Sequence, residues 1–357
     1  MQSTLELAEL DSKIAQLFIV GMPGSELDEA TRRLVDEIGV GGVIFFSRNV
    51  YDPLQLARLC KELQYLSLST QGIPLFLAID QEGGRVARLK PPFTEFPGNE
   101  AIGQSEDPGA EAARFAEITG REMALVGLNM NLAPVLDIPR GQPEDHLKGR
   151  TFGTDSDLVS RLGSVVIEGL QNNGVMAVGK HFPGLGAARF DPHKTGLTID
   201  LTEDEINDID LVPFKAAVEA GVSGMMVSHA IYSSIDPESP ATLSRHIMHD
   251  LLREELGYEG LILTDDLEMG AITNSWSVPE AAALAFEAGA DLLLICERQS
   301  MVMEAISEIR SLILRGSIAL QRLQRSTERI AKAKKRYLSS SEPVMLNKVD
   351  QYFARRK

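Results

Sequence analysis

One stretch of fourteen residues combines a lysine, two histidines, a carboxylate and several small side chains. It runs from Lys180 to His193 and reads KHFPGLGAARFDPH. Asp191 and His193 stand two positions apart, and Pro192 between them favours an extended backbone at Asp191, so we expect both side chains to point the same way. A carboxylate beside an imidazole stabilises its protonated form, which would make His193 a general acid/base near neutral pH. The glycines of this stretch would allow the loop to move or a ligand to approach its backbone. The alternative is a surface turn in which both side chains face water.

A second stretch, LILTDDL at 261–267, is an apolar run that ends in two carboxylates. Asp265 falls where a strand would end, so it could act as a nucleophile, a base or a metal ligand. Asp266 is better placed to cap the helix that follows. We therefore assign the chemistry to Asp265 and a structural role to Asp266.

A third stretch, DQEGGRVAR at 80–88, also follows an apolar run. Its paired glycines permit a tight turn, while Asp80 and Arg88 offer an acceptor and a donor for a polar ligand. The alternative is a turn whose charged side chains are simply solvated. His229 in MMVSHA is interpreted as a histidine at the barrel mouth whose hydrogen bonds are satisfied within the protein, and the alternative is a site residue.

Short apolar runs alternate with longer amphipathic stretches along almost the whole chain. The runs are AQLFIVGM (15–22), GGVIFFS (41–47), PLFLAID (74–80), LNMNLAPVLD (128–137), VMAVGKHF (175–182), GMMVSHA (224–230), GLILTDD (260–266) and DLLLICE (291–297). They are too continuously apolar for strands with one exposed face, and they suit a parallel sheet covered by helices. Eight such units predict an α/β fold consisting of a single (β/α)₈ barrel over residues 1–338, followed by a C-terminal tail at 339–357.

The position of the polar residues favours the barrel over a doubly wound sheet, which is the alternative fold. Barrel enzymes build their sites at the C-terminal ends of the strands. Polar side chains cluster there in this sequence, namely Asp80, Asp137, Lys180, His181, His229, Asp265 and Asp266. A doubly wound fold would more typically carry a glycine-rich phosphate loop after its first strand. MPGSELDEA has no such loop.

Composition and charge exclude several classes of function. The 357 residues are 44% hydrophobic and carry a formal net charge of −16, which argues against nucleic acid and against an anionic membrane surface as partners. The N-terminus has no basic segment leading into an apolar run, and no stretch approaches the length of a membrane span. We therefore expect a cytoplasmic monomer whose partner is a small molecule. Cys60 and Cys296 lie in apolar surroundings and are interpreted as core residues.

The three stretches described first, at 80–88, 180–193 and 261–267, resemble a known family in their order and spacing. DQEGGRVAR, GKHFPGLG with DPHK, and LTDDLEM resemble the single-domain β-N-acetylglucosaminidases of glycoside hydrolase family 3, supported by GGVIFFSRN, NLAPVLDIP, GRTFGTD and SHAIY. The resemblance extends from about residue 12 to 300 and implies a (β/α)₈ barrel without a cofactor. It also implies removal of terminal β-linked N-acetylglucosamine, which in Gram-negative bacteria comes from 1,6-anhydro-muropeptides during cell-wall recycling.

By position, the resemblance implies roles for eight residues. Asp265 would be the nucleophile of a retaining mechanism, and His193 with Asp191 the acid/base pair. The sugar contacts would be Asp80, Arg88, Arg150, Lys180 and His181. Two positions depart from the usual family pattern, because Leu185 and Pro192 stand where the family usually has histidine and serine. Neither change removes Asp191 or His193, so we expect hydrolase activity, with a stiffer or differently posed loop.

Three alternative functions remain open at this point. A metal-dependent barrel hydrolase could use Lys180, His181, His229 and Asp265, but FIVGM lacks the His-x-His pair that usually supplies two ligands. A barrel that binds sugar without catalysis would require the altered loop to have abolished activity. A β-glucosidase or a phosphorolytic enzyme would keep the chemistry and change the substrate.

Overall fold

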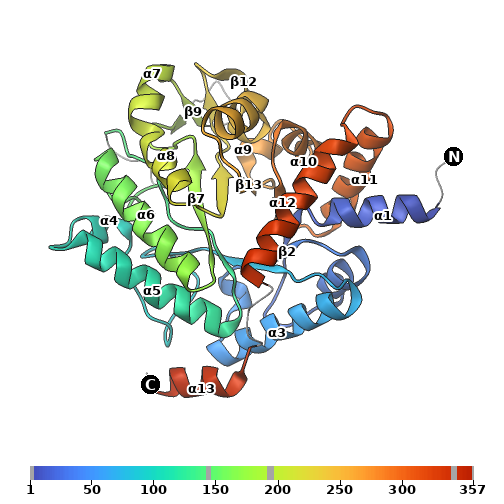
Figure 1. Ribbon diagram of the computed structural model, residues 1–357, viewed down its shortest axis with the longest axis horizontal. Helices are drawn as coiled ribbons and strands as arrows, with labels where there is room; N and C mark the ends of the chain where they lie inside the picture. The colour runs from blue at the N-terminus through green and yellow to red at the C-terminus, as the bar shows by residue number, and fades with distance from the viewer. Residues whose placement is uncertain (1–3, 142–145, 191–196, 339–343, 356–357) are drawn as a thin grey trace.

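The eight apolar runs form one closed barrel of parallel strands in the computed structural model, which describes residues 4–141, 146–190, 197–338 and 344–355 (Figure 1). Each strand pairs with the next in chain order, and the last closes on the first. The strands are β1 (Phe18–Gly21), β2 (Gly42–Phe45), β3 (Phe76–Ile79), β6 (Met130–Asn131), β7 (Met176–Phe182), β10 (Gly224–Val227), β13 (Leu261–Asp266) and β14 (Leu292–Ile295). The (β/α)₈ barrel prediction is confirmed. The doubly wound alternative is wrong, because that fold leaves two sheet edges open.

Helices surround the barrel and explain why its strands are apolar throughout. Phe18, Ile19 and Val20 of β1 are fully buried, and so are Phe76 and Leu77 of β3. One face of each strand packs inside the barrel, and the other packs against helices. The longer helices are α1 (Thr4–Ala15), α3 (Pro53–Thr70), α5 (Pro108–Val126), α6 (Ser156–Asn172), α8 (Val212–Glu219), η5 (His246–Glu255), α10 (Val278–Ala288), α11 (Ser300–Leu314), α12 (Leu320–Leu338) and α13 (Leu346–Ala354).

Shorter helical segments lie in the connections between these elements. They are α2 (Glu29–Arg33), η1 (Leu34–Ile38), η2 (Ser47–Asn49), α4 (Asn99–Gly103), α7 (Glu203–Glu205), η3 (Ile206–Asp210), η4 (Ala241–Leu243) and α9 (Gly270–Thr273). Local sequence signals fix several helix starts. Asp52 accepts the N–H of Gln55 at the start of α3, where Pro53 occupies the first turn, and Asp155 does the same for α6.

Six additional short strands lie in the loops that follow β3, β7 and β10. β4 (Gln81–Gly83) and β5 (Val86–Ala87) form a hairpin, and β8 (Arg189–Phe190), β9 (Leu197–Ile199), β11 (Ile231–Tyr232) and β12 (Asp236–Pro240) form a small sheet. The sequence analysis predicted a turn at 80–88 and a loop after β7, and it did not predict these strands, since segments of two to five residues show no periodicity. These strands frame the C-terminal end of the barrel.

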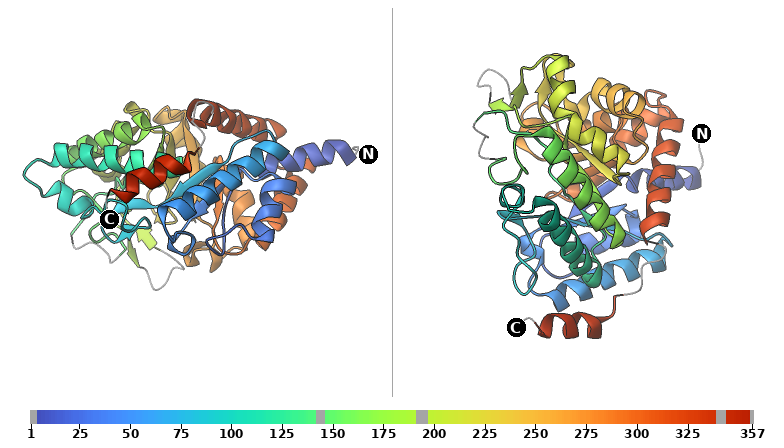
Figure 2. Two further views of the ribbon diagram at one scale, coloured as in Figure 1. Left: turned by 90° about the horizontal axis from the view of Figure 1, so that it is seen from below. Right: turned by 60° about the vertical axis from the view of Figure 1, so that its left-hand side comes forward.

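The tail contains a helix that packs against the barrel's outer layer. α13 contacts α3 and α5 and lies beside α3 (Figure 2). The ring centres of Phe353 and Phe93 are 4.7 Å apart, and Phe353 is 4% exposed. Cys60 and Cys296 are both free and buried, which confirms their interpretation as core residues. Within the described residues, no helix combines the length and apolar character that crossing a lipid bilayer requires.

We predict that Phe353→Ala lowers the free energy of unfolding by about 3 kcal/mol, because it removes a buried aromatic ring and leaves a cavity beside Phe93. Denaturant unfolding measures this change. Met345→Ala is the control, because Met345 precedes the same helix and is exposed. Equal stability of Phe353→Ala and the wild type would show that α13 contributes nothing to the fold.

Candidate active site

A network of buried and partly buried charges stands at the C-terminal end of the barrel. Lys180 Nζ lies 2.8 Å from Asp80 Oδ1 and 2.7 Å from Glu82 Oε1. Arg150 binds the same Glu82 in a bidentate pair, with Nη2 2.7 Å from Oε1 and Nε 2.8 Å from Oε2. Arg88 Nη2 is 3.6 Å from Asp80 Oδ2. The structure thus brings together Asp80, Arg88, Arg150 and Lys180, four of the predicted sugar contacts.

Each member of this network comes from a different element. Asp80 follows β3, Glu82 lies in β4, Lys180 lies in β7, and Arg150 lies in the segment before α6. The segment between the two carboxylates is fixed by Asn131 of β6, whose side chain bonds both the N–H and the carbonyl of Gln81, each at 3.0 Å. The backbone that carries Asp80 and Glu82 is therefore held in place by the barrel.

Burial and pairing act in opposite directions on the ionisation of these groups. Burial alone would lower the pKa of Lys180, but the carboxylates of Asp80 and Glu82 raise it above its ordinary value. Burial alone would raise the pKa of Asp80 and of Glu82, yet nearby cations, Lys180 foremost, hold both below their ordinary values. All three groups are charged at neutral pH. Arg88 Nε is buried and has no hydrogen-bond partner among the described residues.

A second buried pair orients His181. Its Nδ1 lies 2.7 Å from Asp137 Oδ2, and Asp137 Oδ1 accepts the backbone N–H groups of His181 and Leu185. Burial would raise the pKa of Asp137, but His181 and these hydrogen bonds lower it. Because Nδ1 is bound to the carboxylate, Nε2 is the ring nitrogen left for a ligand, and it has no bond within the described part of the chain.

The two glycines in the loop after β7 are explained by packing of the chain on itself. A Cβ on Gly186 would stand 1.7 Å from the carbonyl oxygen of Ile138. Gly184 has φ +124°, and its Cβ would stand 2.7 Å from Cβ of Asp210. Loop mobility and backbone approach to a ligand are thus not needed to account for these glycines. Leu185 is buried, and its contact with Asp137 is made by its backbone N–H.

Asp265 is the penultimate residue of β13, at the strand end where the sequence placed it. Its Oδ1 accepts the backbone N–H of Asp266 at 2.8 Å, and its side chain is partly exposed at the end of the barrel. The Asp266 carboxylate accepts the N–H of Glu268, so it closes a turn and does not cap a helix, since α9 begins only at Gly270. Its structural role is confirmed, in a different form from the one expected.

His229 bridges two loops beside these carboxylates. Nε2 bonds the carbonyl oxygen of Asp266 at 2.9 Å, and Nδ1 bonds the hydroxyl of Thr242 at 2.8 Å. Burial lowers the pKa of His229, although the charge of Asp265 partly opposes this. The interpretation of His229 as a satisfied histidine is confirmed.

Two of the proposed catalytic residues, Asp191 and His193, lie outside the described residues, as does Pro192. The described chain reaches β8 on one side of them and resumes at β9, and these two strands pair with each other. Among the described residues, no three His, Cys, Asp or Glu side chains lie close enough to hold a metal ion. Of the nitrogens that the metal alternative would use, both of His229 bond Thr242 and Asp266, and Lys180 Nζ is paired with Asp80 and Glu82.

The sequence analysis missed the roles of Glu82 and Asp137. Glu82 lies inside the DQEGGRVAR segment, two residues after Asp80. Asp137 ends an apolar run and was noted only as a polar strand end. One signal could have identified Asp137. It ends the apolar run that precedes the run of His181, so the two side chains would be expected at the same end of neighbouring strands. For Glu82 no local signal distinguishes a buried anion from a solvated one.

A closed barrel that gathers buried carboxylate, lysine, arginine and histidine side chains at the C-terminal ends of its strands is the arrangement of a (β/α)₈-barrel enzyme. Residues 9–333 match the family model for the glycosyl hydrolase family 3 N terminal domain. The chain therefore belongs to glycoside hydrolase family 3, and it is a glycoside hydrolase.

Relatives with known names agree with this assignment. A beta-hexosaminidase of Thiobacillus denitrificans is 37% identical over 298 residues, which cover 82% of this chain and 81% of the relative. A family 3 beta-N-acetylglucosaminidase from Paenibacillus sp. str. FPU-7 superposes with a TM-score of 0.89 at 37% identity, covering 97% of this chain and 68% of the other. A beta-N-acetylhexosaminidase from Beutenbergia cavernae superposes with a TM-score of 0.84 at 32% identity, covering 91% of this chain and 98% of the other.

We predict that Asp266→Asn becomes progressively more stable than the wild type as pH rises. Burial, with the charges of Glu268 and Asp265, raises the pKa of Asp266 to about 6. The folded protein holds the Asp266 carboxyl in its neutral form more strongly than the unfolded chain does. The contribution of this carboxyl to the stability of the wild type is therefore greatest below about pH 4, and it falls as pH rises through about 6. Unfolding in denaturant at pH 4 and pH 8 should show a relative gain of about 1–3 kcal/mol. Glu304→Gln, at an exposed position, should follow the wild type; a constant difference between Asp266→Asn and the wild type would contradict this account.

Proposed function

We propose that the protein is a retaining exo-β-N-acetylglucosaminidase that removes terminal, non-reducing β-linked N-acetylglucosamine. The observation that carries this proposal is the buried network of Asp80, Glu82, Lys180 and Arg150 at the barrel mouth. Charged donors and acceptors held in fixed positions suit a ligand whose hydroxyl groups must be recognised in one configuration. The names of the relatives, beta-hexosaminidase and beta-N-acetylglucosaminidase, support the same substrate class.

In this mechanism Asp265 attacks the anomeric carbon and forms a covalent glycosyl-enzyme. His193, paired with Asp191, protonates the departing oxygen and then removes a proton from the water that releases the sugar. Retaining enzymes commonly use two carboxyl groups about 5–5.5 Å apart, and here an imidazole takes the place of one of them. Asp80, Arg88, Arg150, Lys180 and His181 hold the sugar. No cofactor enters any step.

The aglycone we propose is a 1,6-anhydro-muropeptide or a related fragment of peptidoglycan, processed in the cytoplasm during cell-wall recycling. The activity belongs to the barrel over residues 1–338, with residues 339–357 as an added tail, and we propose that the protein acts as a monomer. Nothing in the mechanism requires nucleic acid or a membrane.

We predict that the protein releases 4-nitrophenol from 4-nitrophenyl N-acetyl-β-D-glucosaminide and that Asp265→Ala reduces kcat by at least about 1,000-fold, because the nucleophile is lost. His193→Ala should also be strongly impaired. Asp204→Ala, which changes an exposed aspartate on α7, is the control. Release that requires phosphate would show a phosphorylase, and absence of release by a folded wild type that still binds the sugar would overturn the proposal.

We predict that Glu82→Gln lowers kcat/KM by about 10- to 100-fold, mainly through KM. The variant removes the anion that holds Lys180 and Arg150, and breaking a buried charge pair costs several kcal/mol. Steady-state kinetics with the same substrate measure the effect, and a melting curve reports whether the fold survives. Glu95→Gln is the matched control, because Glu95 pairs with Lys90 on the surface. A folded Glu82→Gln variant with wild-type KM would contradict this role.

A further inference from the structure

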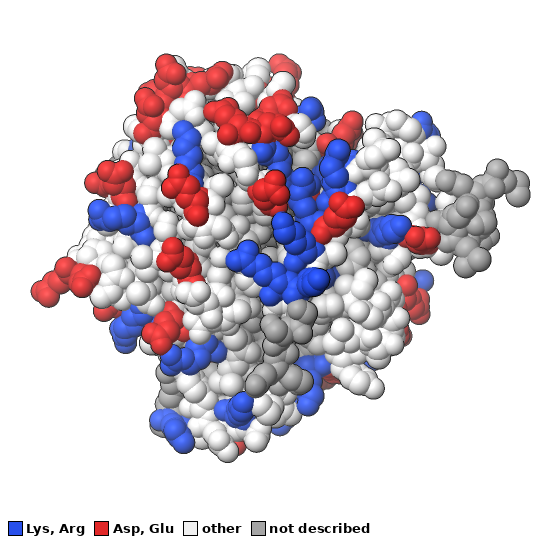
Figure 3. Space-filling model, viewed as in Figure 1, with Lys and Arg blue, Asp and Glu red and all other residues white. Residues whose placement is uncertain are grey.

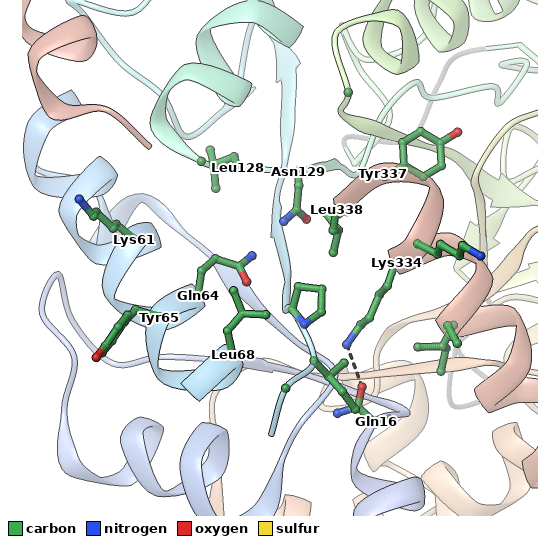
Figure 4. Close-up of a pocket in the computed structure, with 18 of the residues that line it drawn as sticks. Gln16, Lys61, Gln64, Tyr65, Leu68, Leu128, Asn129, Lys334, Tyr337 and Leu338 are labelled. Atoms are coloured by element: carbon green, nitrogen blue, oxygen red, sulfur yellow. Dashed lines mark hydrogen bonds between the residues drawn. The ribbon is translucent and has the colours of Figure 1, made fainter. Parts of the chain in front are cut away.

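A cavity of about 1130 Å³ opens at the end of the barrel opposite the candidate active site (Figure 4). Four of its lining residues stand just before barrel strands, namely Gln16, Pro74, Leu128 and Gly174. Because the strands are parallel, their amino ends meet at one face, and this is the face away from Asp265. α3 supplies one wall, and α12 supplies another. The volume is large enough for a small organic ligand.

Lys334 of α12 brings a buried ammonium group to this cavity. The residue is 4% exposed, its Nζ donates to Gln16 Oε1 at 2.8 Å, and it lies 5.0 Å from the centre of the Phe76 ring. Among the described residues, no carboxylate lies within 4 Å of this ammonium group. Lys180, by contrast, is buried to the same degree and has two carboxylate partners. Burial lowers the pKa of Lys334 to about 7, so an anion beside it would favour the charged form.

Two buried or half-buried amide side chains of the cavity lining, Gln64 and Asn129, are already paired. Gln64 exchanges two hydrogen bonds with the backbone of Leu75, at 2.8 and 3.0 Å. The side chain of Asn129 bonds the carbonyl of Leu75 and the N–H of Leu77. An ammonium has three N–H donors, and the amide oxygen of Gln16 accepts one of them. Lys334, the buried lysine of this lining, therefore has donors left for a ligand.

The mouth of the cavity carries exposed apolar side chains. Tyr65, Leu68 and Ile73 are 74%, 50% and 37% exposed, and all three line the cavity. Large exposed apolar side chains that surround a cavity mark binding surfaces more often than isolated ones do. In Figure 4, Leu68 of α3 lies across the cavity from Lys334 and Leu338 of α12, and the ring of Tyr65 points outward from α3 at the rim.

The surface beside the cavity is basic although the chain as a whole is acidic. Lysine and arginine side chains gather along α12 (Figure 3). Its exposed members are Arg325, Lys332, Lys335 and Arg336. Such a surface attracts anions to this end of a molecule whose net charge is −16.

We propose that this cavity binds an amphipathic carboxylate, with the carboxylate on Lys334 Nζ and an apolar chain lying against Tyr65, Leu68 and Ile73. Of the four lysines among the described residues that line the cavity, Lys334 is buried, and Lys13, Lys61 and Lys335 are exposed. The buried ammonium is a point charge without an arginine fork, and the apolar side chains at the mouth favour an anion that carries an apolar chain over a free phosphate. A long-chain carboxylate has both required parts, a single anionic head and an apolar body. This site is independent of the glycosidase activity.

The test uses dodecanoate as the probe, below its micelle concentration, and isothermal titration calorimetry on the full chain. We expect saturable binding to the wild type, and binding about 10- to 100-fold weaker for Lys334→Met, which keeps the shape and removes the charge. Lys332→Met, exposed on the same helix, is the matched control and should bind like the wild type. Dodecanol, which lacks the charge, and acetate, which lacks the chain, should each bind at least about 10-fold more weakly than dodecanoate.

A second variant keeps the proposal testable if Lys334→Met does not fold. Leu68→Ser changes a half-exposed side chain at the mouth and should weaken dodecanoate binding several-fold while dodecanoate remains preferred over dodecanol. Absence of dodecanoate binding to the wild type would overturn the proposal. Equal affinity of a folded Lys334→Met variant and the wild type, or equal affinity for dodecanoate and dodecanol, would do so as well.

Discussion

The ammonium of Lys180 is almost wholly buried, and an isolated charge at that depth would be strongly unfavourable. Asp80 and Glu82 offset this penalty, but they bring two further charges out of water, and Arg150 and Arg88 in turn neutralise those. A network of this kind is stable only when every member is present and well placed, because removing one leaves an unpaired buried charge. The arrangement of the barrel mouth follows from this constraint. β3, β4, β7 and the segment before α6 must all meet at one point.

A second shared carboxylate extends the same principle to the loop after β7. The Asp137 carboxylate accepts two backbone N–H groups and bonds the His181 ring. The segment after β6 therefore fixes the loop that follows β7. The polar groups that would receive the sugar are thus oriented before it arrives. Preorganised dipoles and charges of this kind are what stabilise a developing charge without reorganisation during the reaction. His229 is neutral, and each of its ring nitrogens makes a hydrogen bond. It supports the backbone at Asp266, next to Asp265, and is not itself needed as an acid or base.

The sequence was informative about the barrel because its eight strands are locally marked. Each is a continuous apolar run, and burial on both faces of a parallel barrel strand produces that pattern. The strand-end residues Asp80, Lys180 and Asp265 were also evident from position alone. Glu82 was not, because its partners Lys180 and Arg150 are brought to it only by closure of the barrel, and Arg150 is 68 positions away. The two small accessory sheets and the glycine contacts at 184 and 186 were missed for the same reason, since they depend on tertiary neighbours and not on local patterning.

The central claim is that the buried network at the barrel mouth holds the sugar with its anomeric carbon at Asp265. A crystal structure of Asp265→Asn with N,N′-diacetylchitobiose tests it most directly. We expect the non-reducing sugar to bond Asp80, Lys180 and Arg150, with its anomeric carbon about 3–3.5 Å from the side chain of residue 265. A disaccharide bound away from this network, or with its anomeric carbon facing another carboxylate, would contradict the account.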